Sequence, residues 1–251
     1  MRFILGLLLS AAVAPLAVGE ELEVAGGVEY FQWQEFRDSG SRLLEETGAR
    51  YFVEAAGANP LNPDWQVDFA GRFYFGRVDY DGQTMSGIPV TTDTDYNGAR
   101  AELGFVRSIG AGPVDALWQI RFALGLEQWR RNLRDTTLPD ATPVSGYVEH
   151  YSTTFARLGV SYRQRGAWSL GAGAKAPFNT REKVDIGTAT FTLKPEGQLS
   201  LFAAAEVAIA PDKRVRIDYD SYRFAKSDQQ AGYYQPEIRQ DTLGIALLYR
   251  F

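Results

Sequence analysis

The chain contains no cysteine and a single histidine, His150, among its 251 residues. The absence of cysteine excludes a disulfide framework. One histidine leaves no second imidazole for a histidine-based zinc site, and the sequence also lacks a G-x-S-x-G nucleophile elbow and a P-loop. Several common enzyme classes are therefore excluded, and we expect neither a metal nor another cofactor.

Long apolar runs are absent after the first 19 residues. Segment 1–19, MRFILGLLLSAAVAPLAVG, has a cation at Arg2, an apolar stretch and small residues at Ala17 and Gly19. This pattern predicts a secretory signal peptide cleaved after Gly19. The alternative is a membrane anchor, but the apolar run of about 16 residues is shorter than the roughly 20 that a spanning helix needs, and Pro15 interrupts it.

Basic runs, linkers and low-complexity blocks are also absent. With 26 basic and 31 acidic residues the net charge is −5, which argues against a nucleic-acid partner. We therefore expect one exported domain over residues 20–251. Aromatic residues make up 13% of the chain, a content that suits a membrane protein with aromatic side chains at both membrane–water interfaces.

Period-two alternation of apolar side chains is the dominant pattern of the chain. It predicts ten strands, at 22–36, 49–58, 64–81, 95–109, 114–131, 148–163, 167–177, 191–210, 214–226 and 239–251. In one of them Trp118, Ile120, Phe122, Leu124 and Leu126 share a face that we expect to point outward. Many of these stretches alternate for about 9–11 residues, the length that a tilted strand needs to cross a bilayer. Strands of soluble sandwiches are typically shorter.

Short and long connections alternate along the chain. Short turns are expected at 59–63, 110–113, 163–166 and 210–213, and longer polar segments at 37–48, 82–95, 132–147, 178–190 and 227–238. This order predicts an all-β fold: a transmembrane antiparallel up-and-down β-barrel of about ten strands. Its short turns would face the periplasm and its longer loops the exterior.

The last predicted strand carries apolar residues at every second position and ends on an aromatic residue: Leu243, Ile245, Leu247, Tyr249 and Phe251. Such a strand must close onto the first one, 22–36, because an unpaired edge in a bilayer costs several kcal/mol per backbone group. Gly26 and Gly27 are small residues suited to that seam.

With this terminus, the chain resembles bacterial outer-membrane β-barrel proteins. The resemblance implies a Gram-negative cell outer membrane as the location, with outer-membrane lipids including lipopolysaccharide as partners. It also implies that the terminal motif is an assembly signal for the outer-membrane assembly machinery.

Charged residues of both signs fall on the inward faces of the predicted strands. They form a predicted lumen network of Glu54, Asp68, Arg72, Glu102, Arg121, Glu127, Arg157, Arg163, Lys175, Glu206, Arg216 and Asp218, with Asp220 as a further member. One interpretation is a lumen filled by salt bridges, as expected of a non-enzymatic surface or structural protein. The other is a narrow solute or ion pathway. A wide porin channel is excluded because such barrels have roughly 16–18 strands.

An enzymatic alternative rests on four residues. Asp93 and Asp95 form an acidic pair near a loop–strand junction, and Glu149 lies beside His150. In part, these residues resemble the omptins, ten-stranded outer-membrane proteases, which implies proteolysis at the extracellular rim. The sequence departs from the omptin pattern at Val148, where that family has an aspartate two residues before its histidine.

Aromatic and basic residues near the predicted loops have a further interpretation. Two interpretations are open for Trp129, Arg130 and Arg131 and for Tyr233 and Tyr234: a ligand or lipid contact, or an interfacial girdle with headgroup anchors. We favour the girdle.

Overall fold

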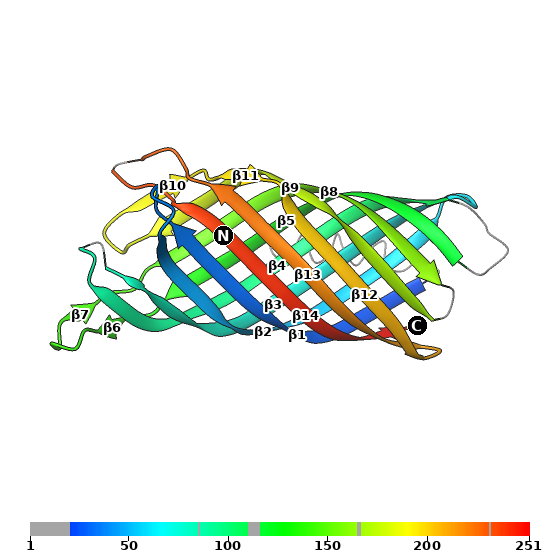
Figure 1. Ribbon diagram of the computed structural model, residues 1–251, viewed down its shortest axis with the longest axis horizontal. Helices are drawn as coiled ribbons and strands as arrows, with labels where there is room; N and C mark the ends of the chain where they lie inside the picture. The colour runs from blue at the N-terminus through cyan, green and yellow to red at the C-terminus, as the bar shows by residue number, and fades with distance from the viewer. Residues whose placement is uncertain (1–20, 85, 110–115, 165–166, 231) are drawn as a thin grey trace.

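Ten long strands form a closed antiparallel barrel in the computed structural model (Figure 1), which describes residues 21–84, 86–109, 116–164, 167–230 and 232–251. The predicted signal peptide, 1–19, lies outside the described residues. The strands are β1 (Glu21–Phe36), β2 (Arg42–Pro60), β3 (Trp65–Gln83), β4 (Pro89–Ile109), β5 (Ala116–Leu133), β8 (Val148–Gln164), β9 (Trp168–Asp185), β12 (Ser200–Ala210), β13 (Lys213–Ala225) and β14 (Glu237–Arg250). Among the described residues, no helix is long and apolar enough to cross a membrane.

The last long strand closes the barrel onto the first. β14 pairs with β1 from Glu23 opposite Arg250 to Phe36 opposite Glu237, and the backbone N–H of Phe251 donates to the carbonyl of Leu22 at 2.9 Å. A Cβ added to Gly27 at this seam would lie 2.4 Å from the carbonyl oxygen of Ile245, so the close approach of the two strands requires glycine there. The predicted closure of the last strand onto the first is confirmed.

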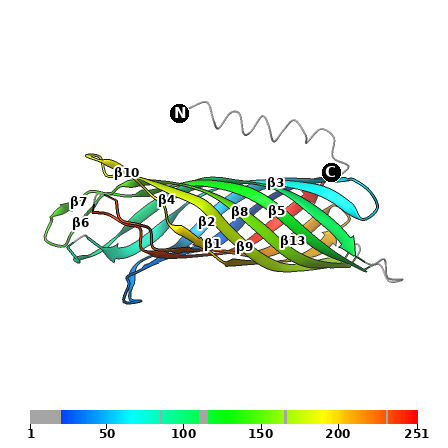
Figure 2. The same ribbon diagram turned by 90° about the horizontal axis from the view of Figure 1, so that it is seen from above.

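The two ends of the barrel differ in their connections (Figures 1 and 2). Short turns and the C-terminus lie at one end, and the longer connections lie at the other. The longer connections contain the hairpin of β6 (Thr136–Thr137) and β7 (Pro143–Val144). They also contain β10 (Thr190–Leu193), which pairs with β9, and β11 (Glu196–Gln198), which pairs with β13. This is the predicted up-and-down arrangement.

Several strands are longer than the sequence pattern predicts. β2 begins at Arg42 instead of 49, β4 begins at Pro89 instead of 95, and β9 continues to Asp185 instead of ending at 177. The predicted strand 191–210 is divided into β10, β11 and β12. The sequence pattern does not reveal these extensions because their outward residues are polar, for example Glu45 and Asp93, so the strand continues where the apolar alternation stops.

An apolar belt surrounds the outside of the barrel. Large apolar side chains point outward and are exposed at Phe73, Leu103, Phe122, Leu158 and Ile245, among other positions on all ten long strands. A continuous exposed surface of this kind is rare on a soluble monomer and is suited to lipid.

Aromatic rings border the belt at its short-turn end. There the ring centroids of Trp118 and Tyr162 are 5.0 Å apart, and those of Tyr162 and Trp168 are 5.3 Å apart. Such rings are typical of a membrane interface. The belt therefore marks the membrane-spanning part of each strand, and the strands continue beyond it at the long-loop end.

Candidate functional site

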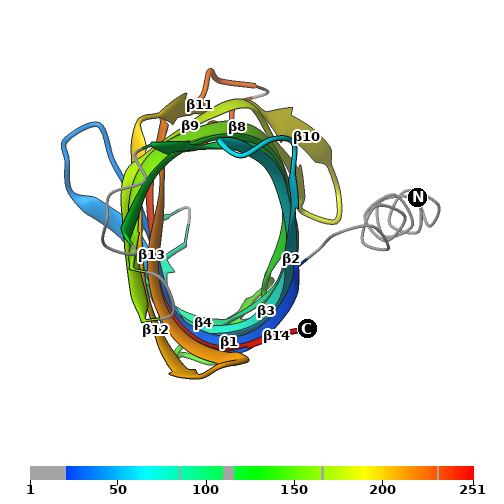
Figure 3. The same ribbon diagram turned by 90° about the vertical axis from the view of Figure 1, so that its right-hand side faces the viewer.

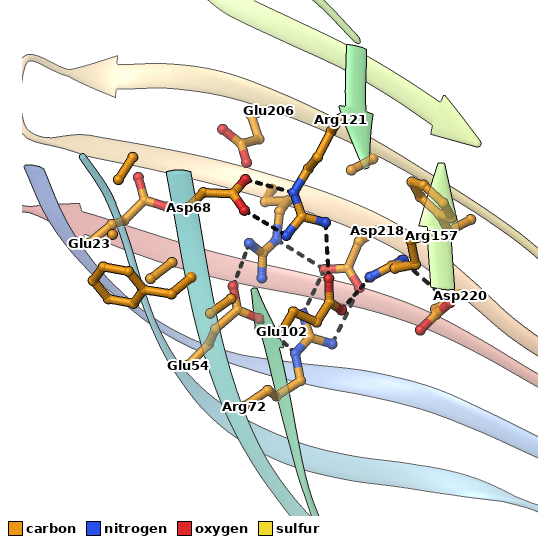
Figure 4. A pocket seen from close by; sticks show the side chains of 18 of the residues that line it. Glu23, Glu54, Asp68, Arg72, Glu102, Arg121, Arg157, Glu206, Asp218 and Asp220 are labelled. Carbon is orange, nitrogen blue, oxygen red and sulfur yellow. Dashed lines mark hydrogen bonds and ion pairs between the residues drawn. The ribbon is translucent and has the colours of Figure 1, made fainter. Parts of the chain in front are cut away.

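The inward side chains near the short-turn end surround a cavity of about 370 Å³ (Figure 4). Figure 3 looks along the barrel axis from this end. The predicted lumen residues that line the cavity are Glu54, Asp68, Arg72, Glu102, Arg121, Arg157, Arg163, Glu206, Arg216 and Asp218. The other two, Glu127 and Lys175, lie farther from this end, where they contact aromatic rings.

Each central arginine of the cavity contacts carboxylates of more than one strand (Figure 4). Arg121 on β5 donates to both oxygens of Asp68 on β3, at 2.6 and 3.0 Å, and to Glu102 on β4 at 3.0 Å. Arg157 on β8 donates to Glu102 at 2.6 Å. The strands on this side of the barrel are thus joined by mutually compensating charges.

The opposite wall of the cavity repeats this arrangement. Arg72 on β3 contacts Glu54 at 2.7 Å and Asp218 on β13 at 3.4 Å, and Arg216 contacts the same two acids at 2.8 and 3.1 Å. The acids and bases of this network satisfy one another, which leaves little uncompensated charge along the lumen.

A third group of ion pairs centres on Asp220. Its carboxylate is contacted by Lys175 at 2.8 Å and by Arg100 at 2.5 Å. Arg100 is absent from the predicted network, although its separation of two residues from Glu102 places both side chains on one face of β4. The alternation of β4 is therefore sufficient to predict that the side chain of Arg100 points into the lumen.

An aromatic layer lies between the charged cavity and the long-loop end of the barrel. It consists of the buried side chains of Trp33, Trp129, Tyr151, Phe155 and Tyr222. The rings of Trp129 and Tyr151 stack with centroids 4.7 Å apart and an interplanar angle of 1°, and Trp33 on β1 meets Tyr151 at 5.5 Å. The rings of opposite walls are thus in contact inside the lumen at this level.

Glu127 belongs to this layer rather than to the charged cavity. Its two carboxylate oxygens accept hydrogen bonds from Tyr74 and Tyr222, at 2.8 and 2.7 Å. The neighbouring Trp129 is buried in the lumen, and so is Arg131, which the sequence placed in an interfacial girdle; only Arg130 of these three residues points outward. That girdle prediction is wrong for Trp129 and Arg131 because the barrel wall continues past the membrane, so inward positions there remain inside the protein.

A buried carboxyl cluster lies beyond the aromatic layer and outside the membrane-spanning part. Arg131 donates to Glu46 at 2.9 and 2.6 Å and to Glu149 at 2.8 Å. Glu35 accepts from the indole N–H of Trp33 at 3.1 Å. Within the described part of the chain, Glu182 is fully buried and neither of its carboxylate oxygens has a hydrogen-bond partner.

The electrostatics of this cluster favour protonated carboxyls. Burial raises the pKa of Glu35 to about 7 despite the opposing effect of Arg131, and nearby Glu149 raises it further. Burial likewise raises the pKa of Glu149 and that of Glu182. Four carboxyl groups share one guanidinium here, so part of the cluster compensates its charge by holding protons.

The four residues of the enzymatic alternative do not come together. Asp93 and Asp95 point outward on β4, where Asp95 contacts Arg77 at 2.8 Å and Arg134 at 3.0 Å. On β8, His150 points outward and Glu149 points into the lumen. Glu149 is therefore separated from the other three by the barrel wall. Among the described residues, no group of three or more His, Cys, Asp or Glu side chains is arranged to hold a metal ion.

Comparisons with known proteins agree with the fold. No protein-family model and no curated protein sequence matches the chain. Among solved structures it is similar to the outer-membrane protease OmpT from Escherichia coli, with a TM-score of 0.53 and 10% identity over 93% of this chain and 98% of that one.

Two further similar structures have lower TM-scores. An outer-membrane channel from Pseudomonas putida F1 has a TM-score of 0.45 and 11% identity over 93% of this chain and 96% of that one. The attachment invasion locus protein Ail of Yersinia pestis has a TM-score of 0.38 and 12% identity over 92% and 98%. At such identities the likeness to OmpT concerns the fold alone. The chain is a closed ten-stranded β-barrel with the fold of outer-membrane barrel proteins.

Proposed function

We propose that this protein is an integral outer-membrane barrel of structural or surface type whose lumen is closed to solutes. The aromatic layer carries the proposal: Trp33 and Trp129 from separate strands, β1 and β5, pack with Tyr151 across the barrel, on the long-loop side of the charged cavity. A continuous solute pathway would have to cross this layer.

Charge pairing supports the same function. Four arginines of the cavity, Arg72, Arg121, Arg157 and Arg216, are held by carboxylates at 2.6–3.5 Å, so they are not arranged as a ring of one sign that would attract and pass ions. The predicted signal peptide and the apolar belt support insertion into the outer membrane, with the short turns toward the periplasm.

Single-channel recording in a planar bilayer tests the closed lumen. The wild-type barrel is expected to show no stable conductance steps, whereas a Trp33→Ala, Trp129→Ala double variant is expected to conduct because it removes two rings of the layer. Trp118→Ala is the matched control, since this exposed tryptophan belongs to the outer girdle. Stable steps from wild-type protein that the double substitution leaves unchanged would show that solutes bypass the layer.

A further inference from the structure

A β-bulge in β9 lies at the level of the buried carboxyl cluster. Asn179 and Thr180 together lie opposite Thr153 on β8, and Asn179 has a left-handed backbone conformation with a φ of 51°. Asparagine is one of the few residues besides glycine that tolerate this conformation. Bulges of this kind re-aim the side chains that follow them.

Glu182 points into the lumen because of this extra residue. The alternation that places Lys175 and Pro177 inside would otherwise turn Arg181 and Lys183 inward, toward the carboxyl cluster. With the bulge, both bases are exposed on the outer wall and Glu182 is fully buried. The bulge thus keeps two cations out of the cluster and adds a carboxyl group to it.

The cluster has too little positive charge for its acids. Arg131 pairs with Glu46 at 2.6 Å and with Glu149 at 2.8 Å. Among the described residues, this leaves Glu35 and Glu182 without an ion pair, and the carboxylate oxygens of Glu182 without any hydrogen-bond donor. Ionising both groups would place uncompensated negative charge in a site closed to water, which is costly.

Four tyrosines complete the surroundings of the cluster. Tyr80 on β3 and Tyr147 before β8 have pKa values raised by burial, to about 12 for Tyr80. Tyr96 on β4 donates to Glu46, and Tyr151 on β8 is buried beside the cluster. Because tyrosine ordinarily titrates near pH ~10, the carboxyl groups are the ones that titrate around neutral pH.

Two short segments lie over the cluster at the long-loop end (Figure 1). Leu193 of β10 is the cross-strand partner of Glu182 and is buried. In the connection between β13 and β14, the backbone N–H of Ser227 donates to the carbonyl of Gln235 at 2.9 Å, and the N–H of Gln235 donates to Oγ of Ser227 at 2.8 Å. Both residues are buried, and the side chain of Gln235 lies beside Glu35, whose pKa it lowers. We refer to β10, Ser227 and Gln235 together as the cover.

The cover is attached to the wall by few interactions. β10 has four residues and, among the described strands, pairs with β9 alone. Its Phe191 stacks on Tyr233 with ring centroids 4.7 Å apart, which joins the two segments. Lys226 pairs with Asp38 at 2.8 Å, but both side chains are exposed and such pairs contribute little. Segments with so few buried contacts open locally at low cost. The other charged side chains beside the cover are exposed to water: Lys194 and Asp228.

We propose that the carboxyl cluster is a proton-operated switch of the long-loop mouth: the cover closes when Glu35 and Glu182 are protonated and opens when they lose their protons. A buried carboxylate lacks the water that would solvate it, whereas a neutral carboxyl group costs much less to bury. Opening the cover admits water to both groups without moving the aromatic layer, so the proposal stands apart from the closed lumen.

The direction of the pH dependence follows from the two states. Burial raises the pKa of Glu35 to about 7 in the closed barrel, and a hydrated carboxyl group in the open state has an ordinary, lower pKa. The closed state therefore binds protons more tightly. Closure is complete at acidic pH and is lost as the pH rises through about 7.

The switch can be measured by maleimide labelling of the full barrel refolded in detergent. Ser227→Cys places a thiol in the cover, and Asp140→Cys provides an exposed reference thiol. The labelling rate at residue 227, divided by that at residue 140, is expected to rise about tenfold or more between pH 6 and pH 9. With Glu35→Gln and Glu182→Gln added, the ratio is expected to stay nearly constant, because glutamine is neutral throughout.

Glu237→Gln is the matched control for these substitutions. Glu237 contacts Arg239 at 2.9 Å outside the lumen, so this variant is expected to keep the full rise. Folding of each variant is verified by heat-modifiable gel mobility. A wild-type ratio that does not change with pH would overturn the proposal, and so would an equal rise in the Glu35→Gln, Glu182→Gln variant.

Infrared spectroscopy of the wild-type barrel gives a second measurement that requires no substitution. The C=O stretching band of protonated carboxyl groups is expected at pH 6, and it should disappear over the pH range in which labelling of residue 227 rises. Absence of this band at pH 6 would show that the carboxyl groups are already charged in the closed barrel, and the switch would then be refuted.

Discussion

Arg131 on β5 and Glu46 on β2 are fully buried and joined across the lumen, with Nε and Nη2 of the arginine donating to one carboxylate oxygen at 2.9 and 2.6 Å. Tyr96 donates to the other oxygen of Glu46. Because Arg131 also contacts Glu149, a single guanidinium ties together β2, β5 and β8 beyond the membrane. These contacts hold the wall in shape where lipid no longer surrounds it.

Replacing Arg131 by methionine leaves Glu46 and Glu149 buried without their cation. We expect a loss of about 3–5 kcal/mol in the free energy of unfolding, measured by urea titration in detergent. Arg134→Met is the control, since Arg134 is half-exposed and contacts Asp95 on the outer wall, where screening by water leaves little net contribution. Equal stability of the two variants would show that the buried pair is not structurally important.

The lipid-facing assignment predicts a strong position dependence of an added charge. Phe122→Arg places a cation in the apolar belt and should cost about 2–4 kcal/mol in a bilayer, measured by unfolding from lipid vesicles. Gln128→Arg adds the same side chain to the outward face of the same strand, beyond the belt, and should cost much less. If both variants insert with wild-type stability, the outer face of β5 is not in contact with lipid.

The outward and inward faces of the barrel could be predicted wherever lipid imposes an alternation. Phe122 and Arg121 differ by one residue and have opposite environments, and the pattern assigns both. At the long-loop end the outer wall faces water, so the outward neighbours of Trp129 and Arg131 are polar. The sequence there no longer alternates between apolar outward and polar inward residues, and the inward direction of Trp129 and Arg131 cannot be predicted from it. The sequence pattern alone also cannot show that Glu46, 85 residues before Arg131, lies across the lumen from it, because that contact depends on the register of the whole barrel.

The pKa of Glu35 predicts a pH dependence of stability. Burial raises this pKa from 4.5 to about 7, so the folded protein binds the proton more tightly than the unfolded chain does. The resulting stabilisation is complete below pH 4.5 and is lost as the pH rises toward 7, corresponding to about 3 kcal/mol. In Glu35→Gln the free energy of unfolding should therefore fall less between pH 5 and pH 8 than in wild type.

Glu237→Gln supplies the comparison for this pH profile. Glu237 points outward and contacts Arg239, so its substitution should leave the wild-type slope in place. A Glu35→Gln profile parallel to wild type would mean that another group of the carboxyl cluster holds the proton.

Phe251 is expected to act in assembly rather than in the finished barrel. It follows β14, its side chain is exposed, and its ring packs against Tyr249 at 4.8 Å. Deleting it should reduce the amount of barrel found in outer-membrane fractions while leaving the stability of refolded protein nearly unchanged. If the variant without Phe251 reaches the outer membrane in normal amounts, Phe251 has no role in assembly.

The most direct test of an outer-membrane barrel closed toward the exterior is cysteine labelling, for which a chain without cysteine is well suited. Asp140→Cys lies in the exposed turn between β6 and β7, and Ala204→Cys lines the cavity near the short-turn end. In intact cells, a membrane-impermeant maleimide too large for the general porins should label residue 140 alone. Residue 204 should react only after the outer membrane is permeabilised. Labelling of residue 204 in intact cells would contradict the account, because the reagent would have had to cross the aromatic layer or the barrel would have to be inserted in the opposite orientation.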